Sequence, residues 1–379
     1  MTKSADPKVT PWRFYGYFLR LGATGFGGPI ALAGFMQRDL VEERQWISRE
    51  DYVDGLALAQ LAPGPLAAQL AMYLGYVRGG ILGASIVALL FVLPSFLMVW
   101  GISAAYVRFG GLPWMQALFY GIGASVIGII ARSAFKLTRL TLGTSRVLWA
   151  IFAVMALSTA WTERESVWLF LFAGALTMLL ARKAPASVMA LLAGIGPTQL
   201  PAAAAPTLST LFWFFAKAGA FVFGSGLAIV PFLYGEVVST QGWLDDRQFL
   251  DAVAVAMITP GPVVITVAFI GYLVSGPWGM TAAALGVFLP VYLFVVIPAP
   301  YFRRHRAQPA VKAFVDGVTA AATGAIAGAA YVLATRAIVD LPTAAMAVAT
   351  FAALSRFKIS ELWLIAASGA VGLAFKTFG

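Results

Sequence analysis

Long apolar stretches separated by short charged loops run along the whole chain. A stretch of about 20 apolar residues can cross a bilayer as a helix, so the pattern predicts an all-α protein with about 12–13 spans. The predicted spans lie near 14–36, 50–77, 81–106, 113–134, 147–161 and 166–181, and again near 208–234, 248–274, 278–302, 310–334, 340–354 and 360–375.

Two of these stretches are interrupted by Pro-Gly-Pro, at 63–65 and 260–262. Each proline costs roughly 3 kcal/mol in a helix interior, and glycine about 1 kcal/mol more. Irregular backbone at membrane depth is tolerated only inside protein or beside a water-filled cavity. We therefore predict two broken helices, with half-helices that start near Pro65 and Pro262 and offer free N–H groups to an anion. The alternative is that each tripeptide is a packing kink or a hinge.

Both breaks belong to a longer internal duplication. With an offset of 197 residues, Gly22 aligns with Gly219, Trp46 with Trp243, and the first Pro-Gly-Pro with the second. Tandem units of this size are common in secondary transporters. We divide the chain into an N-terminal segment, 1–13, a first repeat, 14–183, a connecting segment, 184–206, and a second repeat, 207–379.

The positions of Lys and Arg favour repeats of opposite orientation. If the connecting segment includes a short crossing near 187–196, most basic loops fall on one side, which the positive-inside rule makes cytoplasmic. Arg38 and Arg44 then lie on the outer side, among few other cations. Without that crossing, the basic run near 303–312 would face outward. We therefore expect inverted-topology repeats, with a cytoplasmic N-terminus and a periplasmic C-terminus.

The composition supports a membrane protein. Hydrophobic residues make up 60% and charged residues 11% of the chain, whereas soluble domains are about 25% charged. Lys3, Lys8 and Arg13 precede a long apolar segment, a pattern that does not predict a cleavable signal peptide. The net charge of +10 sits in short loops, so the topology and anionic lipids explain it better than nucleic acid does.

Several kinds of chemistry are disfavoured. The chain has no cysteine and one histidine, His305, within a basic loop, so we expect no disulfide, no metal site and no cofactor. No Walker A pattern is present. Without a cluster of His, Cys and carboxylate side chains, an enzyme is disfavoured, and transport would be driven by ion gradients or by the membrane potential.

Two cations occupy equivalent positions inside apolar stretches. Arg20 and Lys217 each precede a glycine-rich segment, and a cation at membrane depth costs about 2.5–3.5 kcal/mol. One alternative is that they snorkel to the interface. Together with the half-helix starts, they predict an anion cradle. Its candidate residues are Arg20, Lys217, Gly27, Gly28, Gly64, Pro65, Gly224, Ser225, Gly261, Pro262, Gln60 and Gln69.

Two carboxylates also coincide across the duplication. Asp54 and Asp251 each lie about nine residues before a break. They are candidates for proton binding that couples to transport. The alternative is structural, with each aspartate capping its helix or pairing with a nearby arginine.

Specific motifs recur with the breaks. The first half has FGGP at 26–29 and the second has FGSG at 223–226, each followed by its Pro-Gly-Pro. In these motifs the sequence resembles the chromate ion transporter family, as a long-chain member with two domains. The resemblance covers nearly the whole chain and is strongest at 20–95 and 215–292. Because FGSG departs from FGGP, the two halves are not expected to be equivalent.

The resemblance implies export of chromate across the bacterial plasma membrane, and thereby chromate resistance. Sulfate is an isosteric dianion, so a carrier of sulfate or another oxyanion is one alternative, and an anion channel is another. The partners implied are the anion and the lipid bilayer, and a homo-oligomer is compatible with the sequence.

Overall fold

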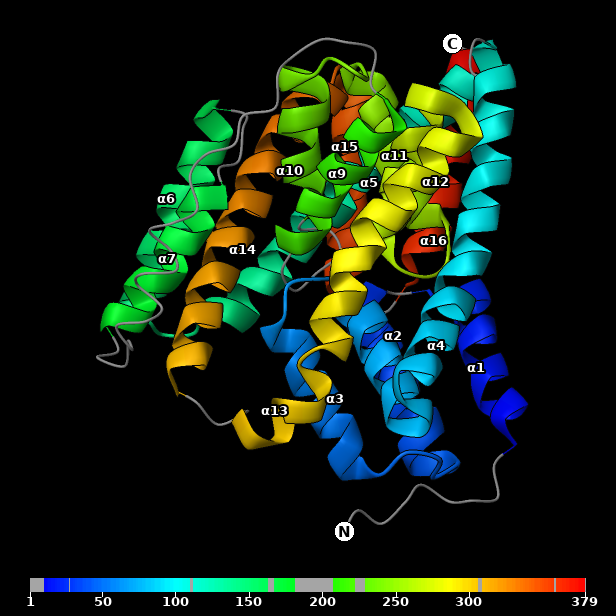
Figure 1. The fold of residues 1–379 in the computed structure, drawn as a ribbon. Helices are drawn as coiled ribbons and strands as arrows, with labels where there is room; N and C mark the ends of the chain where they lie inside the picture. Colours follow the sequence, from blue (N-terminus) through cyan, green and yellow to red (C-terminus); the bar gives the residue numbers. More distant parts are fainter. Residues whose placement is uncertain are drawn as a thin grey trace.

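The computed structural model describes residues 10–26, 28–109, 112–162, 167–180, 207–221, 229–305, 309–357 and 359–378. Within these ranges the regular structure is helical, without strands, which confirms the predicted all-α class (Figure 1). Residues 1–9 of the N-terminal segment, the whole connecting segment 184–206, and the residues Gly27, Gly224 and Ser225 lie outside the described residues.

The described parts of the two halves contain a similar succession of elements, with η4 and α13 present in the second half alone. The first half has α1 (Pro11–Thr24), α2 (Gly28–Met36), the π-helix η1 (Gln37–Glu43), α3 (Arg49–Leu61), α4 (Leu66–Phe109), α5 (Pro113–Leu142), α6 (Arg146–Thr162) and α7 (Val167–Leu180). The second has α9 (Leu208–Phe221), α10 (Ile229–Leu233), the π-helix η3 (Tyr234–Thr240), α11 (Asp246–Ile258), the 3₁₀ turn η4 (Val263–Ile265), α12 (Thr266–Val296), α13 (Ala299–His305), α14 (Pro309–Ala337), α15 (Leu341–Arg356) and α16 (Glu361–Phe378).

Four helical stretches of the described chain are long and apolar enough to cross a membrane. They are Leu66–Phe109, Pro113–Arg139, Val263–Phe302 and Lys312–Ala337. The other predicted spans correspond to shorter helices. For example, α1 has 14 residues and α3 has 13, which gives each a length of about 20 Å against a hydrocarbon core of about 30 Å.

The predicted span 14–36 is instead a hairpin of two short helices. Gly25 ends α1 and Gly28, with φ 75°, begins α2, so the glycine-rich segment reverses the chain. The rings of Phe14 and Trp46 lie 6.4 Å apart, so the chain after α2 returns to the start of α1. Arg38 and Arg44 therefore lie at the end of the molecule where α1 begins, not at the opposite end as the continuous span predicted.

Both Pro-Gly-Pro tripeptides interrupt helices, as predicted. The first separates α3 from α4, and the second separates α11 from η4 and α12. Gly64 has φ 138° and Gly261 has φ 100°, which favours glycine at both positions. After the first break the chain folds back, because Gly55 of α3 lies against Leu70 and Tyr73 of α4.

Each long helix is also bent at an equivalent place. Gly80 in α4 has φ 60° and ψ −148°, and Gly276 in α12 has φ 60° and ψ −154°. These kinks divide each helix into a short arm next to the break and a long arm that is able to cross the membrane. Figure 1 shows the long arms of α4 and α12 running in opposite directions, which supports the proposed inversion of the repeats.

The two halves interlock through their later helices. α5 packs against α15 and α16, whereas α14 packs against α6 and α7 (Figure 1). The contacts are close and equivalent: a Cβ on Gly121 of α5 would lie 1.9 Å from the carbonyl oxygen of Ser368, and one on Gly317 of α14 would lie 2.5 Å from that of Ala173. Each half therefore completes its packing with helices from the other.

Candidate anion-binding site

The second break is hydrogen-bonded to the first half of the chain. The N–H of Gly261 donates to the carbonyl of Gly25, with N and O 2.9 Å apart. The hydroxyl of Ser95, in the long arm of α4, donates to the carbonyl of Pro260 at 2.6 Å. Gly261 and Ser95 are both buried. The tip of the second broken helix is thus held between α1 and α4.

The first break packs against the equivalent part of the second half, but through an apolar contact. A Cβ on Gly64 would lie 3.2 Å from a methyl group of Val291, which occupies the position of Ser95 in α12. Sequence reasoning did not identify Ser95. The difference between a serine and a valine at equivalent positions was the available signal.

The backbone donors at the breaks are partly used. The N–H of Gly261, which we expected to be available to an anion, is occupied by Gly25. At the first break, the side-chain amide of Gln69 donates to the carbonyl of Pro63 at 2.6 Å, and its own carbonyl oxygen is buried without a partner. Gln60 is exposed near the end of α3 and no described contact joins it to Gln69. Pro65 and Pro262 are buried at the starts of the following half-helices.

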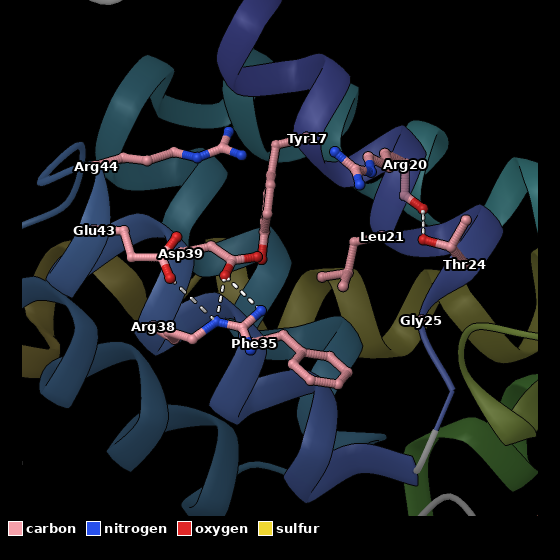
Figure 2. A pocket seen from close by; sticks show the side chains of 10 residues that line it. All are labelled: Tyr17, Arg20, Leu21, Thr24, Gly25, Phe35, Arg38, Asp39, Glu43 and Arg44. Atoms are coloured by element: carbon pink, nitrogen blue, oxygen red, sulfur yellow. Dashed lines mark hydrogen bonds and ion pairs between the residues drawn. The ribbon is translucent and has the colours of Figure 1, made fainter. Parts of the chain in front are cut away.

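A water-accessible pocket lies between α1 and η1, at the N-terminal end of the molecule. Its volume is about 320 Å³, enough for roughly ten waters at about 30 Å³ each. The lining residues are Tyr17, Arg20, Leu21, Thr24, Gly25, Phe35, Arg38, Asp39, Glu43 and Arg44 (Figure 2).

The pocket contains more cations than carboxylates. Arg38 donates to Asp39 at 2.8 Å and lies 3.6 Å from Glu43, and the bond to Asp39 raises the pKa of Arg38 above its usual range. The guanidinium of Arg44 lies 4.7 Å from the centre of the Trp46 ring. Arg20 is exposed and has no hydrogen bond or ion pair from its side chain within the described residues. The three arginines outnumber Asp39 and Glu43, so the pocket attracts anions.

The inner end of this pocket reaches the contact between the two halves. Gly25 lines the pocket, and its carbonyl accepts the hydrogen bond from Gly261. In Figure 2, Gly25 lies on the side of the pocket away from Arg44 and Glu43. The basic side chains and the second break are therefore parts of one continuous region.

The second cation of the predicted cradle lies elsewhere. Lys217 is half-buried in α9, at the position equivalent to Arg20, and does not line this pocket. No described contact joins Lys217 to Arg20. Of the predicted cradle residues, Arg20 lines the pocket and Gly261 adjoins it through Gly25, and the cradle itself stays a prediction.

The two aspartates lie inside their helices rather than at caps. The N-caps of α3 and α11 are Ser48 and Asp245. Asp54 is fully buried, and Asp251 is 4% exposed. The hydroxyl of Tyr106, from the long arm of α4, donates to Asp251 at 2.7 Å, a partner that the sequence did not predict.

Comparison with known proteins gives one family. The model of a family described as "Chromate transporter" matches residues 12–179 and 209–373. A chromate transport protein of Cupriavidus metallidurans is 59% identical over 97% of this chain and 94% of its own length. A probable chromate transport protein of Synechococcus elongatus is 58% identical, over 91% and 89%. A chromate transport protein of Pseudomonas aeruginosa is 31% identical, over 98% and 94%. No solved structure matches the chain.

Proposed function

The chain belongs to the chromate transporter family, and from this premise we propose that it exports chromate across the cell membrane. The substrate is then a tetrahedral dianion, carried without chemical change. The observation that carries the proposal is the continuity between the basic pocket and the second break at Gly25. An anion that enters among the arginines approaches the contact between the two halves at Gly25.

Electrostatics supports binding of a dianion in this region. At about 5 Å and an effective dielectric constant near 20, one cation attracts a dianion by roughly 6–7 kcal/mol before desolvation costs are subtracted. Arg20 can provide such an interaction because it has no carboxylate partner in the described chain. Arg38 can do so when the anion displaces its two carboxylate partners, Glu43, which is exposed, and Asp39, which is 17% exposed.

The membrane potential favours the outward direction. A dianion leaving a negative interior gains about 4.6 kcal/mol per 100 mV, which sustains a gradient of roughly three orders of magnitude. Export therefore needs neither ATP nor a co-transported ion. Protons that bind at Asp54 or Asp251 are a further candidate for coupling.

We further propose the bacterial inner membrane as the location, with the N-terminus in the cytoplasm and the C-terminus in the periplasm. The hairpin of α1 and α2 supports this orientation, because it brings Arg38 and Arg44 to the same side as the N-terminal cations. Lipids surround the long apolar helices, and assembly into a homo-oligomer is compatible with the fold.

A second candidate is a carrier of sulfate or another oxyanion that also accepts chromate. The pocket favours this candidate because it is wide and open to water, and charge without close fit does not separate isosteric dianions. The two candidates differ in whether sulfate competes with chromate at similar concentration and is itself transported.

The decisive experiment measures intracellular radiolabelled chromate in cells that express the protein, against cells with an empty vector, with sulfate varied. We expect lower accumulation, and we expect the difference to vanish when the membrane potential is dissipated. Equal or higher accumulation would contradict export. Transport of sulfate itself would favour the second candidate.

A further inference from the structure

Within the described residues, the charges that line the basic pocket are not matched at the equivalent positions of the other half. Two of its arginines, Arg38 and Arg44, belong to η1 and its C-terminal cap. The equivalent residues of η3 and its cap are Gly235 and Gln241. The backbone is nevertheless the same, because both π-helices have seven residues and end in the same way: Arg44 has φ −98° and ψ −19°, and Gln241 has φ −91° and ψ −23°.

The remaining charged positions show the same imbalance. Glu43 is replaced by Thr240, whereas Arg20 and Asp39 keep their charges as Lys217 and Glu236. The first set therefore has three cations and two carboxylates, and the second has one of each. Of the two sets of equivalent positions, the first therefore has an excess of positive charge and the second does not.

The two sets lie at opposite ends of the molecule. In Figure 1, α1 and α2 lie in the lower half of the molecule, where the described chain begins, whereas α9 and α10 lie in the upper half. An anion that approaches from the side of α1 and α2 meets the arginines of η1, whereas the equivalent positions at the other side are Gly235, which is buried, and Gln241, which is half-buried.

We propose that the pocket formed by Arg20, Arg38 and Arg44 is a one-sided loading site for divalent tetrahedral oxyanions, present on the N-terminal face and missing from the opposite face. The proposal rests on the transport function proposed above and adds the site and its sidedness. Asp39 and Glu43 hold Arg38 in the empty pocket, and the incoming anion takes their place. Glu43 is exposed and Asp39 is 17% exposed, so the anion displaces one exposed and one half-buried carboxylate from Arg38.

The absence of native cysteine allows a direct test of occupancy. Thr24 lines the pocket and is exposed, so a single Thr24→Cys substitution reports its accessibility to a membrane-impermeant thiol reagent. With the full-length protein in vesicles, we expect sulfate to slow the modification. Combining Thr24→Cys with Arg38→Gly and Arg44→Gln should raise the sulfate concentration for half protection about tenfold.

Those two substitutions copy residues that the chain already has at equivalent positions, so the fold should accept them. Arg38→Lys keeps the charge and should keep most of the protection. If sulfate gives no protection, or if protection is the same after both arginines are removed, the proposed site is wrong.

The sidedness is tested by transport. Initial rates of chromate movement are measured from each face at zero potential, with the exposed face identified by protease cleavage of an N-terminal tag. We expect the Michaelis constant from the N-terminal face to be about tenfold lower than from the other face. The ratio should fall toward one in the Arg38→Gly, Arg44→Gln variant, and Gln241→Arg should lower the constant at the opposite face.

Three outcomes separate the possible failures. If the wild-type protein moves no chromate, the proposed function fails. If it moves chromate with equal constants from both faces, only the loading site fails. If the protection and the ratio depend on anionic phospholipid in the vesicles instead of on the added oxyanion, the arginines bind lipid headgroup phosphates, and the proposal is overturned.

Discussion

Ser95 connects the first half of the chain to the break of the second half. Its hydroxyl is fully buried and donates to the carbonyl of Pro260. That carbonyl belongs to the irregular segment at the second break. A Cβ at position 261 would collide with the hydroxyl oxygen of Ser95, so only glycine fits there. One hydroxyl therefore holds the tip of the broken helix.

Replacing Ser95 by alanine should leave the carbonyl of Pro260 buried without a donor. An unsatisfied buried group costs about 1–3 kcal/mol, so we expect a loss of stability of that size. Thermal unfolding of purified protein in detergent would measure it. Ser103→Ala is the control, because Ser103 bonds only the carbonyl of Val99 in its own helix and its loss should cost less.

Arg20 and Lys217, the two cations at equivalent positions, provide a second test at the scale of single residues. We expect Arg20→Gln and Lys217→Gln each to lower chromate export at least tenfold, because each removes one of the two charges of the proposed anion cradle. Export is measured as the difference in intracellular chromate between expressing and control cells.

Arg108→Gln serves as a matched control, since Arg108 lies at the end of α4 and over the ring of Phe109, away from the pocket. Normal export by both Arg20→Gln and Lys217→Gln, with the protein present in the membrane, would contradict the anion cradle.

The breaks and kinks determine how the helices are divided. α4 is straight enough to cross the membrane only after Gly80, where the chain takes a conformation that glycine alone adopts easily. The same conformation recurs at Gly276. Each kink separates the short arm near the break from the long arm that crosses the membrane.

A substitution at the kink separates backbone strain from crowding. A Cβ on Gly80 would meet no atom within 4 Å, so Gly80→Ala should destabilise by about 1–3 kcal/mol through strain alone. Gly101→Ala, in the same helix and also without neighbours, should be neutral or slightly stabilising. Thermal unfolding compares the two, and equal effects would show that the kink is not strained.

The sequence predicted the elements that depend on local chemistry. Proline and glycine act on their own backbone, so the breaks at 63–65 and 260–262 were correctly located. The reversal at Gly25 and Gly28 was missed, because an apolar stretch of sufficient length reads as one span whether or not it turns back. Arg38 and Arg44 were consequently expected on the wrong side of the molecule.

The parts of the site that arise from distant contacts were not predictable. Nothing near Gly25 indicates that it accepts a bond from Gly261, and nothing near Asp251 points to Tyr106. Arg20 was found because its charge is unusual inside an apolar stretch. Arg38 and Arg44 were overlooked as ordinary loop cations, since their shared pocket exists only when η1 folds against α1.

At the scale of the whole molecule, neither half has a complete set of helix contacts. α5 needs α15 and α16, and α14 needs α6 and α7. The core around α1 likewise includes Val291, Val295 and Phe302 from the other half. The repeats are thus units of sequence but not independent units of packing.

This arrangement predicts the behaviour of separated halves. A fragment that ends at Arg182, expressed alone, should be degraded, because α5 exposes the surface that α15 and α16 cover. Co-expression with a second fragment that starts at Thr207 should restore both fragments and chromate export. Immunoblots of membranes measure the fragments, and a stable first fragment on its own would contradict the interlocked packing.

The interlocked packing also determines when the contacts of α5 can form during biosynthesis. Roughly 200 residues separate the end of α5 from the start of α15, and at about 5–20 residues per second their synthesis takes about 10–40 s. During this interval α5 is already in the bilayer with its small-residue face turned to lipid or to whatever protein escorts the nascent chain. The last helices to be synthesised therefore cover the surface of an early helix. A ribosome that stalls before α15 leaves that surface uncovered, and quality control can recognise the unfinished protein.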